Sequence, residues 1–371
     1  MIKIEYPYNE KSFSITKEEF EREYVDLIIS TIDTIETNKI LNAVTFKSSK
    51  EVKGEKLTIE KLLVLGFEDL LSVDSIIENK ILNLSKDILK NNHPSKAKVI
   101  DEYFSTRKTN VDYNFKKKDA SIRAKILDDL NILKKNRPSQ KTIYKTLQKK
   151  ISNFFMKYSV LLNKKTCYYC NIEYINTISQ RGKNLNHFTL DHFLSQTDFP
   201  YYSLCLYNFV PSCYSCNSKF KRTKKFVFDE NLKFLSPTSN EYTIFTDCEF
   251  KLLFNIDGIN EEDKIQNIRK IEDFEVVLQN RGTTPGYNSF LDMFKLEGRY
   301  NFHKNEAFKM ILKRQIYSDS DILEIEKTLG YIRDFDSIKK DIFGSAIFNE
   351  EEKNNPLTRY RTEIAKQLGL L

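Results

Sequence analysis

Two cysteine pairs in the middle of the chain have the spacing of a metal site. The first is Cys167-Tyr-Tyr-Cys170 and the second is Cys213-Tyr-Ser-Cys216. Zinc takes four thiolates in a tetrahedron, and a Cys-x-x-Cys turn presents two of them to one ion. Two such turns fill every position, so the sequence predicts a structural zinc. A thioredoxin-like redox motif is the alternative for one pair, but it does not account for the other.

Between and beside these pairs lie polar residues suited to hydrolysis. Asp191 and His192 are adjacent, so on an extended backbone their side chains point to opposite sides. The carboxylate can then bind a metal ion while the imidazole acts as a general base. Asn217 follows Cys216 in the first turn of an expected helix, and hard oxygens of this kind suit Mg²⁺ or Mn²⁺. Asn208 is a further polar residue between the two cysteine pairs. The alternatives are a hydrogen-bonded core histidine for His192 and a simple turn residue for Asn208.

This arrangement resembles an HNH endonuclease of the ββα-metal type with a four-cysteine zinc knuckle. The resemblance covers residues 167–225 and matches Asp191, His192, Asn208 and Asn217 to the family's Asp-His…Asn…Asn variant, with Asn in place of the third-position His. It implies that Asp191 and Asn217 hold Mg²⁺ or Mn²⁺, that His192 activates water, and that Asn208 orients the imidazole or fixes the hairpin. Local phrases around Asp191 and Asn208 also resemble HNH nucleases of bacterial anti-phage systems, including the Septu-type nuclease subunit.

Five cations lie within seven residues just beyond the second cysteine pair: Lys219, Lys221, Arg222, Lys224 and Lys225. These cations begin where the expected metal-binding helix ends. Because they lie beside the expected metal site, attraction of nucleic-acid phosphates is favoured over an ordinary solvated surface. A lysine-rich helix is also expected over residues 141–162, leading into the first cysteine pair. For that helix, a phosphate-binding face and a solvated face are equally good interpretations.

The expected fold class is α+β and mostly helical, with a central ββα-metal HNH module that contains the structural zinc. We predict three domains: a helical N-terminal domain (1–140), the nuclease module with its basic lead-in helix (141–235) and an α+β C-terminal domain (236–371). In the N-terminal domain the patterns predict a short strand from residue 1 that ends near Pro7, a capped helix from Thr16, and helical tracts over 58–89, from Ser95 and over 120–134. In the C-terminal domain they predict two strands within 242–257, a strand at 275–278, and helices over 302–317, 321–329 and 357–368. For Arg299, a structural role at a domain interface is favoured over a phosphate clamp.

The composition of the chain indicates its cellular location and partners more than the reaction that it performs. The net charge of +7 is a modest excess and does not by itself imply nucleic acid. No long apolar run or secretory leader is present, so a cytoplasmic location without membrane contact is expected. Cys205 and Cys248 are then buried small hydrophobes in a reducing compartment. The sequence has no P-loop, so any energy-dependent sensing requires a partner ATPase or sensor protein.

The leading functional hypothesis is a metal-dependent endonuclease that hydrolyses DNA phosphodiester bonds in an anti-phage defence system. DNA is favoured over RNA, and a homodimer is a possible arrangement because one such site cuts one strand. Two alternatives remain: a stand-alone restriction or homing-type nuclease, and a zinc-stabilised nucleic-acid-binding module without catalysis.

Overall fold

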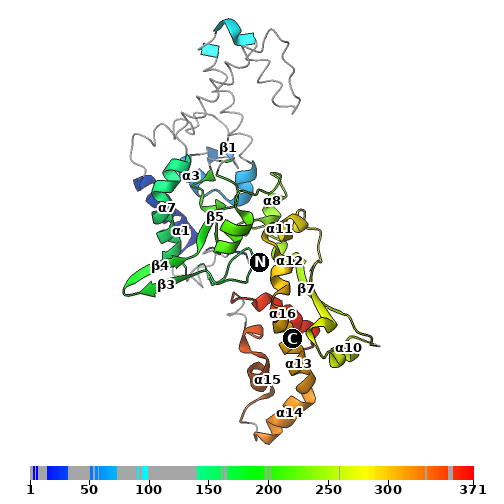
Figure 1. Cartoon of the computed structure of the whole chain (residues 1–371). Helices are drawn as coiled ribbons and strands as arrows, with labels where there is room; N and C mark the ends of the chain where they lie inside the picture. The colour runs from blue at the N-terminus through cyan, green and yellow to red at the C-terminus, as the bar shows by residue number, and fades with distance from the viewer. Residues whose placement is uncertain are drawn as a thin grey trace. The chain divides into compact units, whose positions relative to one another are not determined.

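The computed structural model describes residues 3–4, 6, 15–31, 51–52, 55–56, 58–72, 90–91, 94–98, 140–159, 162, 165–196, 199, 202–258, 260–330, 332–349 and 354–371. These residues form an α+β protein whose sheets are all small, two-stranded and antiparallel (Figure 1). The expected α+β class is therefore confirmed. The helix predicted over 120–134 and residues 73–89 of the tract predicted over 58–89 lie outside the described residues.

The chain divides into two compact units. Unit 1 contains residues 1–20, 151–193 and 209–371, and unit 2 contains residues 21–150 and 194–208. This division differs from the three predicted domains, whose boundaries stay a prediction. Two helices cross from one unit to the other along the chain: α1 (Lys17–Thr31) and α7 (Gln140–Lys157).

Both crossing helices begin and face inward as the sequence predicts. The Thr16 hydroxyl accepts a hydrogen bond from the Glu19 amide at 3.2 Å, and the Glu19 carboxylate accepts one from the Thr16 amide at 2.9 Å. This reciprocal cap satisfies amides that a helix start leaves unpaired. In α7 the expected apolar face is buried, as at Leu147, Ile151 and Phe155, but the helix ends at Lys157 instead of continuing to residue 162.

Unit 2 is held together by side chains that reach the loop 194–208. Its described elements are β1 (Glu51–Val52), β2 (Glu55–Lys56), α3 (Ile59–Leu63), helical residues 67–72, η1 (Pro94–Lys96) and η5 (Leu206–Asn208). The Tyr24 hydroxyl donates to the Leu204 carbonyl at 2.7 Å, and the Tyr202 hydroxyl donates to the Leu70 carbonyl at 2.9 Å. Cys205 is fully buried here, as predicted for a cysteine outside the zinc set.

Unit 1 carries two hairpins and a short helix in its first half. These are β3 (Asn176–Gln180) with β4 (Lys183–His187), then β5 (Thr189–His192) with β6 (Phe209–Ser212), then the π-helix η6 (Ser215–Lys221). β5 packs against η6. The second hairpin and the helix that follows it hold most of the residues singled out above.

The second half of unit 1 is a sheet covered by helices. Its elements are α8 (Leu232–Leu235), α9 (Ile244–Asp247), β7 (Cys248–Phe254), α10 (Glu261–Asn267), η7 (Ile271–Asp273), β8 (Phe274–Asn280), α11 (Tyr287–Phe294), α12 (Leu296–Asn301), α13 (Lys304–Ile316), α14 (Asp319–Thr328), α15 (Phe335–Phe343), η8 (Ser345–Ile347) and α16 (Thr358–Gln367). The strand predicted at 275–278 pairs with β7, and α16 packs on β7. The three helices predicted from residue 302 onward correspond to α13, α14 and α16.

Two strand predictions are wrong within the described residues. The first half of the segment 242–257 forms the helical turn α9 because Thr246 and Asp247 donate their amides to the Thr243 carbonyl, both at 2.9 Å. The Thr246 hydroxyl also donates to that carbonyl, a local bond that competes with sheet pairing. Near the N-terminus, residues 3, 4 and 6 are not in a strand, and the Ile4 amide donates to the Pro237 carbonyl. In the described part of the chain, no helix is long and apolar enough to cross a membrane.

Candidate metal centre and active site

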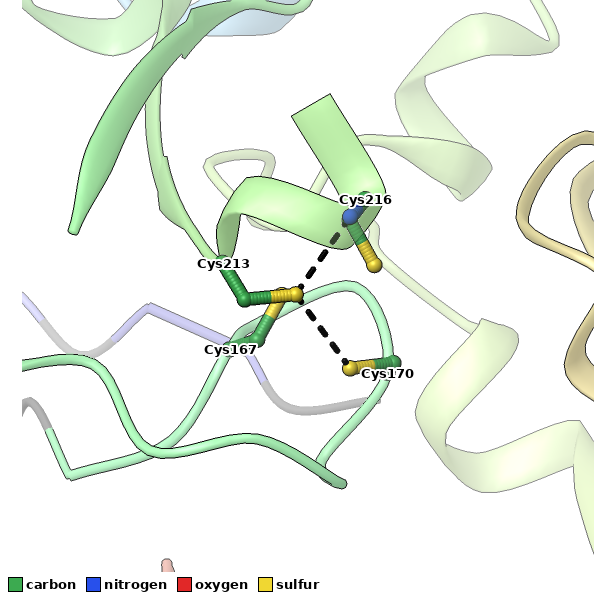
Figure 2. A group of neighbouring side chains, drawn as sticks. All are labelled: Cys167, Cys170, Cys213 and Cys216. Atoms are coloured by element: carbon green, nitrogen blue, oxygen red, sulfur yellow. Dashed lines mark hydrogen bonds between the residues drawn. The ribbon is translucent and has the colours of Figure 1, made fainter. Parts of the chain in front are cut away.

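The four predicted cysteines converge on one buried point in unit 1. Cys167 and Cys170 lie in the turn after α7, Cys213 follows β6, and Cys216 lies in η6. Their sulfur atoms all lie within 4.8 Å of one another, and those of Cys170 and Cys213 are 3.9 Å apart (Figure 2). A tetrahedron with Zn–S bonds of about 2.3 Å separates its sulfurs by about 3.8 Å. The cluster can therefore hold a metal ion such as zinc.

The backbone around the cysteines also fits this use. The Cys216 amide donates to the Cys213 sulfur at 3.4 Å, one of the contacts drawn in Figure 2. The first turn is closed by the Asn171 amide, which donates to the Cys167 carbonyl at 2.8 Å. Asn171 has a φ of 51°, a left-handed conformation that asparagine tolerates better than most residues. Both turns are thus fixed by hydrogen bonds and do not depend on the metal alone for their shape.

Arg299 of α12 contacts one sulfur from each cysteine pair. Its guanidinium donates to Cys216 at 3.1 Å and to Cys170 at 3.3 Å, and it also bonds the Glu173 carboxylate at 2.9 Å. The next residue, Tyr300, donates its hydroxyl to the Cys170 carbonyl. Spacing could not reveal this partner, because more than 80 residues separate Arg299 from Cys216. The expectation of a structural arginine agrees with these contacts, which are to the cysteine cluster.

Charge and burial oppose each other in this cluster. Burial raises the pKa values of Cys167 and Cys216, and hydrogen bonds between the thiols add to the effect. Burial also acts on Cys170, but hydrogen bonds from the other three thiols and the charge of Arg299 hold its pKa well below the ordinary value. In the same way, burial disfavours the Arg299 cation, yet the neighbouring thiolates raise its pKa. The guanidinium is therefore a fixed positive charge beside the cysteine sulfurs.

We expect replacement of Arg299 by glutamine to loosen metal retention. Loss of a group that hydrogen-bonds a metal ligand typically costs about ten- to a hundredfold in metal affinity. The measurement is zinc release from the purified chain to a coloured chelator. Arg361→Gln is the matched control, because Arg361 also pairs with a glutamate, Glu306 at 2.9 Å, but does not contact a cysteine. Equal release rates from the two variants would contradict a role for Arg299 at the metal.

Asp191 and His192 lie side by side on β5, as expected. They pair with Val210 and Phe209 of β6, respectively. Adjacent strand residues point to opposite faces, so the two side chains diverge. Both are buried, and the His192 ring lies 4.8 Å from the Phe209 ring between centroids. The hairpin therefore positions a carboxylate and an imidazole on two different sides.

Asp191 accepts both of its hydrogen bonds on the same oxygen. Its Oδ2 atom accepts from the Tyr169 hydroxyl at 2.6 Å and from the Lys221 ammonium at 2.7 Å. Burial and the carboxylate charge raise the pKa of Tyr169 well above its ordinary value, so the phenol stays protonated and donates. No described residue donates to the other oxygen, Oδ1. Asp191 is thus held firmly from one side while one oxygen stays available as a ligand.

Lys221 is the exception among the five cations of the basic segment. The sequence suggests a lysine directed at phosphate, but Lys221 is only 4% exposed. Besides Asp191 it donates to the His192 carbonyl at 2.5 Å, so it ties the end of η6 to β5. The expectation of an exposed phosphate contact is corrected for this residue, because its charge is used inside the protein. The other four cations, Lys219, Arg222, Lys224 and Lys225, are exposed, and their binding to nucleic acid stays a prediction.

We expect Lys221→Met to lower the free energy of unfolding by about 3 to 5 kcal/mol, because it leaves the buried Asp191 charge without its ion-pair partner. Urea unfolding of single and double variants measures the pair. Adding Asp191→Asn removes the uncompensated charge, so the double variant should recover part of the loss. A double variant that is no more stable than Lys221→Met would show that the ion pair does not matter.

The two predicted asparagines have different surroundings. Asn217 is half-buried in η6, and its carbonyl accepts a hydrogen bond from the Arg222 amide at 2.8 Å. Asn208 is fully buried in unit 2, where its side chain accepts from the Leu194 amide at 2.7 Å and donates to the carbonyls of Leu194 at 3.1 Å and Tyr202 at 2.9 Å. Asn208 thus closes the loop 194–208 that connects β5 to β6. These bonds favour the loop-fixing role over hydrogen bonding to the imidazole.

No known protein family, curated protein or solved structure matches this chain.

Proposed function

We propose that this chain is a metal-dependent endonuclease of the HNH type that hydrolyses phosphodiester bonds in DNA. The observation that carries the proposal is the pairing of β5 with β6 and the packing of β5 against η6. This arrangement places Asp191 and His192 on opposite sides of one strand and sets Asn217 on the helix that packs against that strand. The buried cysteine cluster fastens the start of this helix.

Besides the four cysteine sulfurs suited to a structural metal ion, the chain offers oxygen donors suited to a catalytic divalent ion. Asp191 offers the oxygen Oδ1, to which no described residue donates, and Asn217 offers an amide oxygen on the neighbouring helix. Few, hard oxygen ligands are typical of Mg²⁺ and Mn²⁺ sites that keep several waters. When bound there, such an ion supplies charge stabilisation at the scissile phosphate and at the leaving oxygen.

The chain's own residues would then share the work. His192 would take a proton from the attacking water, and Asp191 and Asn217 would hold the ion. Tyr169 and Lys221 fix the orientation of the Asp191 carboxylate through its second oxygen. Since a ligand carboxylate works best when it is itself hydrogen-bonded, both are positioning residues in this scheme. A role in anti-phage defence is part of the proposal and rests on the resemblance alone. The proposal also includes a partner ATPase or sensor, because the sequence has no P-loop, and a homodimer, because one such site cuts one strand.

A second function has one observation in its favour. The buried Asp191–Lys221 ion pair gives Asp191 a cationic partner of its own, as in a purely structural ion pair. A zinc-stabilised module that binds nucleic acid without cutting it would need nothing more at Asp191. Incubating the purified chain with supercoiled plasmid and Mg²⁺ separates the two functions. A nuclease converts the plasmid to nicked or linear forms and is stopped by chelation of Mg²⁺, whereas a binding module only retards it.

A further inference from the structure

The β3–β4 hairpin is a ribbon that is exposed on almost every residue. Its five cross-strand pairs run from Asn176 with His187 to Gln180 with Lys183, and the turn holds Arg181 and Gly182 (Figure 1). Nine of its ten strand residues are exposed, and Thr177 is half-buried. An isolated two-stranded ribbon gains little stability from its own pairing. Its exposure therefore suggests a surface used for contact.

The charge of the ribbon indicates the kind of partner. No aspartate or glutamate occurs from residue 174 to residue 190, although the chain has 52 acidic residues. Arg181 and Lys183 lie at the tip, and the strands contribute asparagine, glutamine, serine and threonine side chains that can donate and accept hydrogen bonds. Such a surface is complementary to a polyanion with hydrogen-bonding groups, and it contains nothing that repels one.

One face of the ribbon, called the free face below, is exposed in the part of the chain that the structure describes. On the opposite face, the Asn186 side chain donates to the Ser152 hydroxyl of α7 at 2.9 Å. The free face consists of three cross-strand pairs, all six residues exposed: Asn176, Ile178, Gln180, Lys183, Leu185 and His187. At its centre, Ile178 and Leu185 are 43% and 52% exposed. Two exposed apolar side chains, flanked by polar and cationic residues, are complementary to a partner surface that carries both charged groups and methyl groups.

We propose that the β3–β4 ribbon binds in the major groove of a DNA duplex next to the cut site, an inference that rests on the proposed nuclease function. The major groove of B-form DNA is about 12 Å wide and admits a two-stranded ribbon. Arg181 and Lys183 then contact phosphates, and the Ile178–Leu185 pair contacts thymine methyl groups. Duplex RNA is excluded as the main partner because its major groove is deep and narrow.

The position of the ribbon in the chain supports this assignment. β4 ends at His187 and β5 begins at Thr189, so the ribbon runs almost directly into the strand that carries Asp191. The segment from Gly182 to Asp191 spans at most about 32 Å even when fully extended. This is less than one turn of duplex, about 34 Å. Contacts made by the tip therefore fall within one helical turn of the phosphate that is cut.

The test uses the full chain with His192→Ala, so that DNA is bound and not cut, and a labelled duplex of about three helical turns. With Arg181→Ala and Lys183→Ala together, we expect the Kd to rise roughly tenfold and the slope of log K against log salt to flatten by up to about 2. With Ile178→Ser and Leu185→Ser, we expect the Kd to rise about three- to tenfold with an unchanged slope. Fluorescence anisotropy over a salt series measures both, and circular dichroism checks that each variant is folded.

Lys327→Ala with Lys340→Ala is the matched control, since it removes two exposed cations from α14 and α15. The chain with Arg181→Ala and Lys183→Ala is called the tip variant. If the control weakens DNA binding as much as the tip variant does, the effect comes from net charge alone and the ribbon proposal is wrong. It is also wrong if the tip variant binds duplex like the parent, or loses affinity equally for single-stranded DNA and duplex RNA. If the wild-type chain cuts plasmid and the tip variant binds duplex DNA with normal affinity, only the ribbon proposal is overturned and the nuclease proposal stands. Tip-dependent duplex binding without any cutting overturns only the nuclease.

Discussion

Replacing His192 by alanine should reduce plasmid cleavage by roughly a hundred- to ten-thousand-fold, the usual cost of losing a general base. The variant keeps Asp191, Asn217 and the cysteine cluster, so zinc content and duplex binding should remain at wild-type levels. His192 lies on β5 beside the Phe209 ring, and the smaller alanine leaves the strand pairing of the hairpin intact. Time courses of plasmid nicking under single-turnover conditions measure the loss.

Companion variants separate the base from the ion ligands. Asp191→Ala should also abolish cleavage, and raised Mn²⁺ should recover part of it, whereas Asn217→Ala should be intermediate because an amide is a neutral, weaker ligand. His303→Ala is the matched control: this histidine lies just before α13 in unit 1, and its loss should leave the rate within about twofold of wild type. A His192→Ala chain that cuts as fast as wild type would refute the assignment of the base and, with it, the HNH interpretation.

Replacing Cys213 by serine should cost the chain its zinc and leave the region around η6 unfolded. Structural zinc can contribute about 10 kcal/mol or more of folding free energy, which exceeds the net stability of many domains. Cys213 is suited to this test because its sulfur accepts the Cys216 amide and lies next to the Cys170 sulfur. Metal analysis by mass spectrometry and limited proteolysis measure the two effects separately.

Cys205→Ser is the matched control for this experiment. Cys205 is equally buried, but its thiol donates to the Leu62 carbonyl at 3.1 Å, an interaction that a serine hydroxyl can replace. The control should bind a full complement of zinc and resist proteolysis around residues 167–225. A Cys213→Ser chain that stays folded, zinc-free and active would show that the cluster is not a structural metal site.

Local patterns were sufficient for the parts of the fold that depend on neighbours in sequence. The Thr16–Glu19 cap and the apolar face of α7 are both set by residues within a few positions of one another. The cysteine cluster was predictable for a different reason: thiol chemistry permits few uses for two Cys-x-x-Cys turns. These features required no knowledge of the rest of the chain.

The surroundings of the candidate site could not be predicted, because long-range packing determines them. Lys221 belongs to a run of cations that looks solvent-exposed in sequence, and only the path of η6 brings it under β5 to Asp191. Tyr169 lies within the first cysteine pair, where nothing marks its hydroxyl as the partner of a carboxylate. The turn α9 replaced a predicted strand because local threonine bonds outweighed an alternating pattern.

The contact of Arg299 with both cysteine pairs also affects how this region of the chain could be exchanged between proteins. α12 supplies the counter-charge of the cluster, and Phe294 of α11 stacks on Tyr169 at 4.3 Å between ring centroids. A cassette cut after residue 235 would lose both, although it would retain every residue of the recognisable motif. Recombination that moves the motif alone would thus leave the cysteine cluster without the Arg299 charge and the Tyr169 ring without its stacking partner Phe294. The segment that must move together is therefore longer than the motif, because it includes α12, a helix that contains none of the motif's residues.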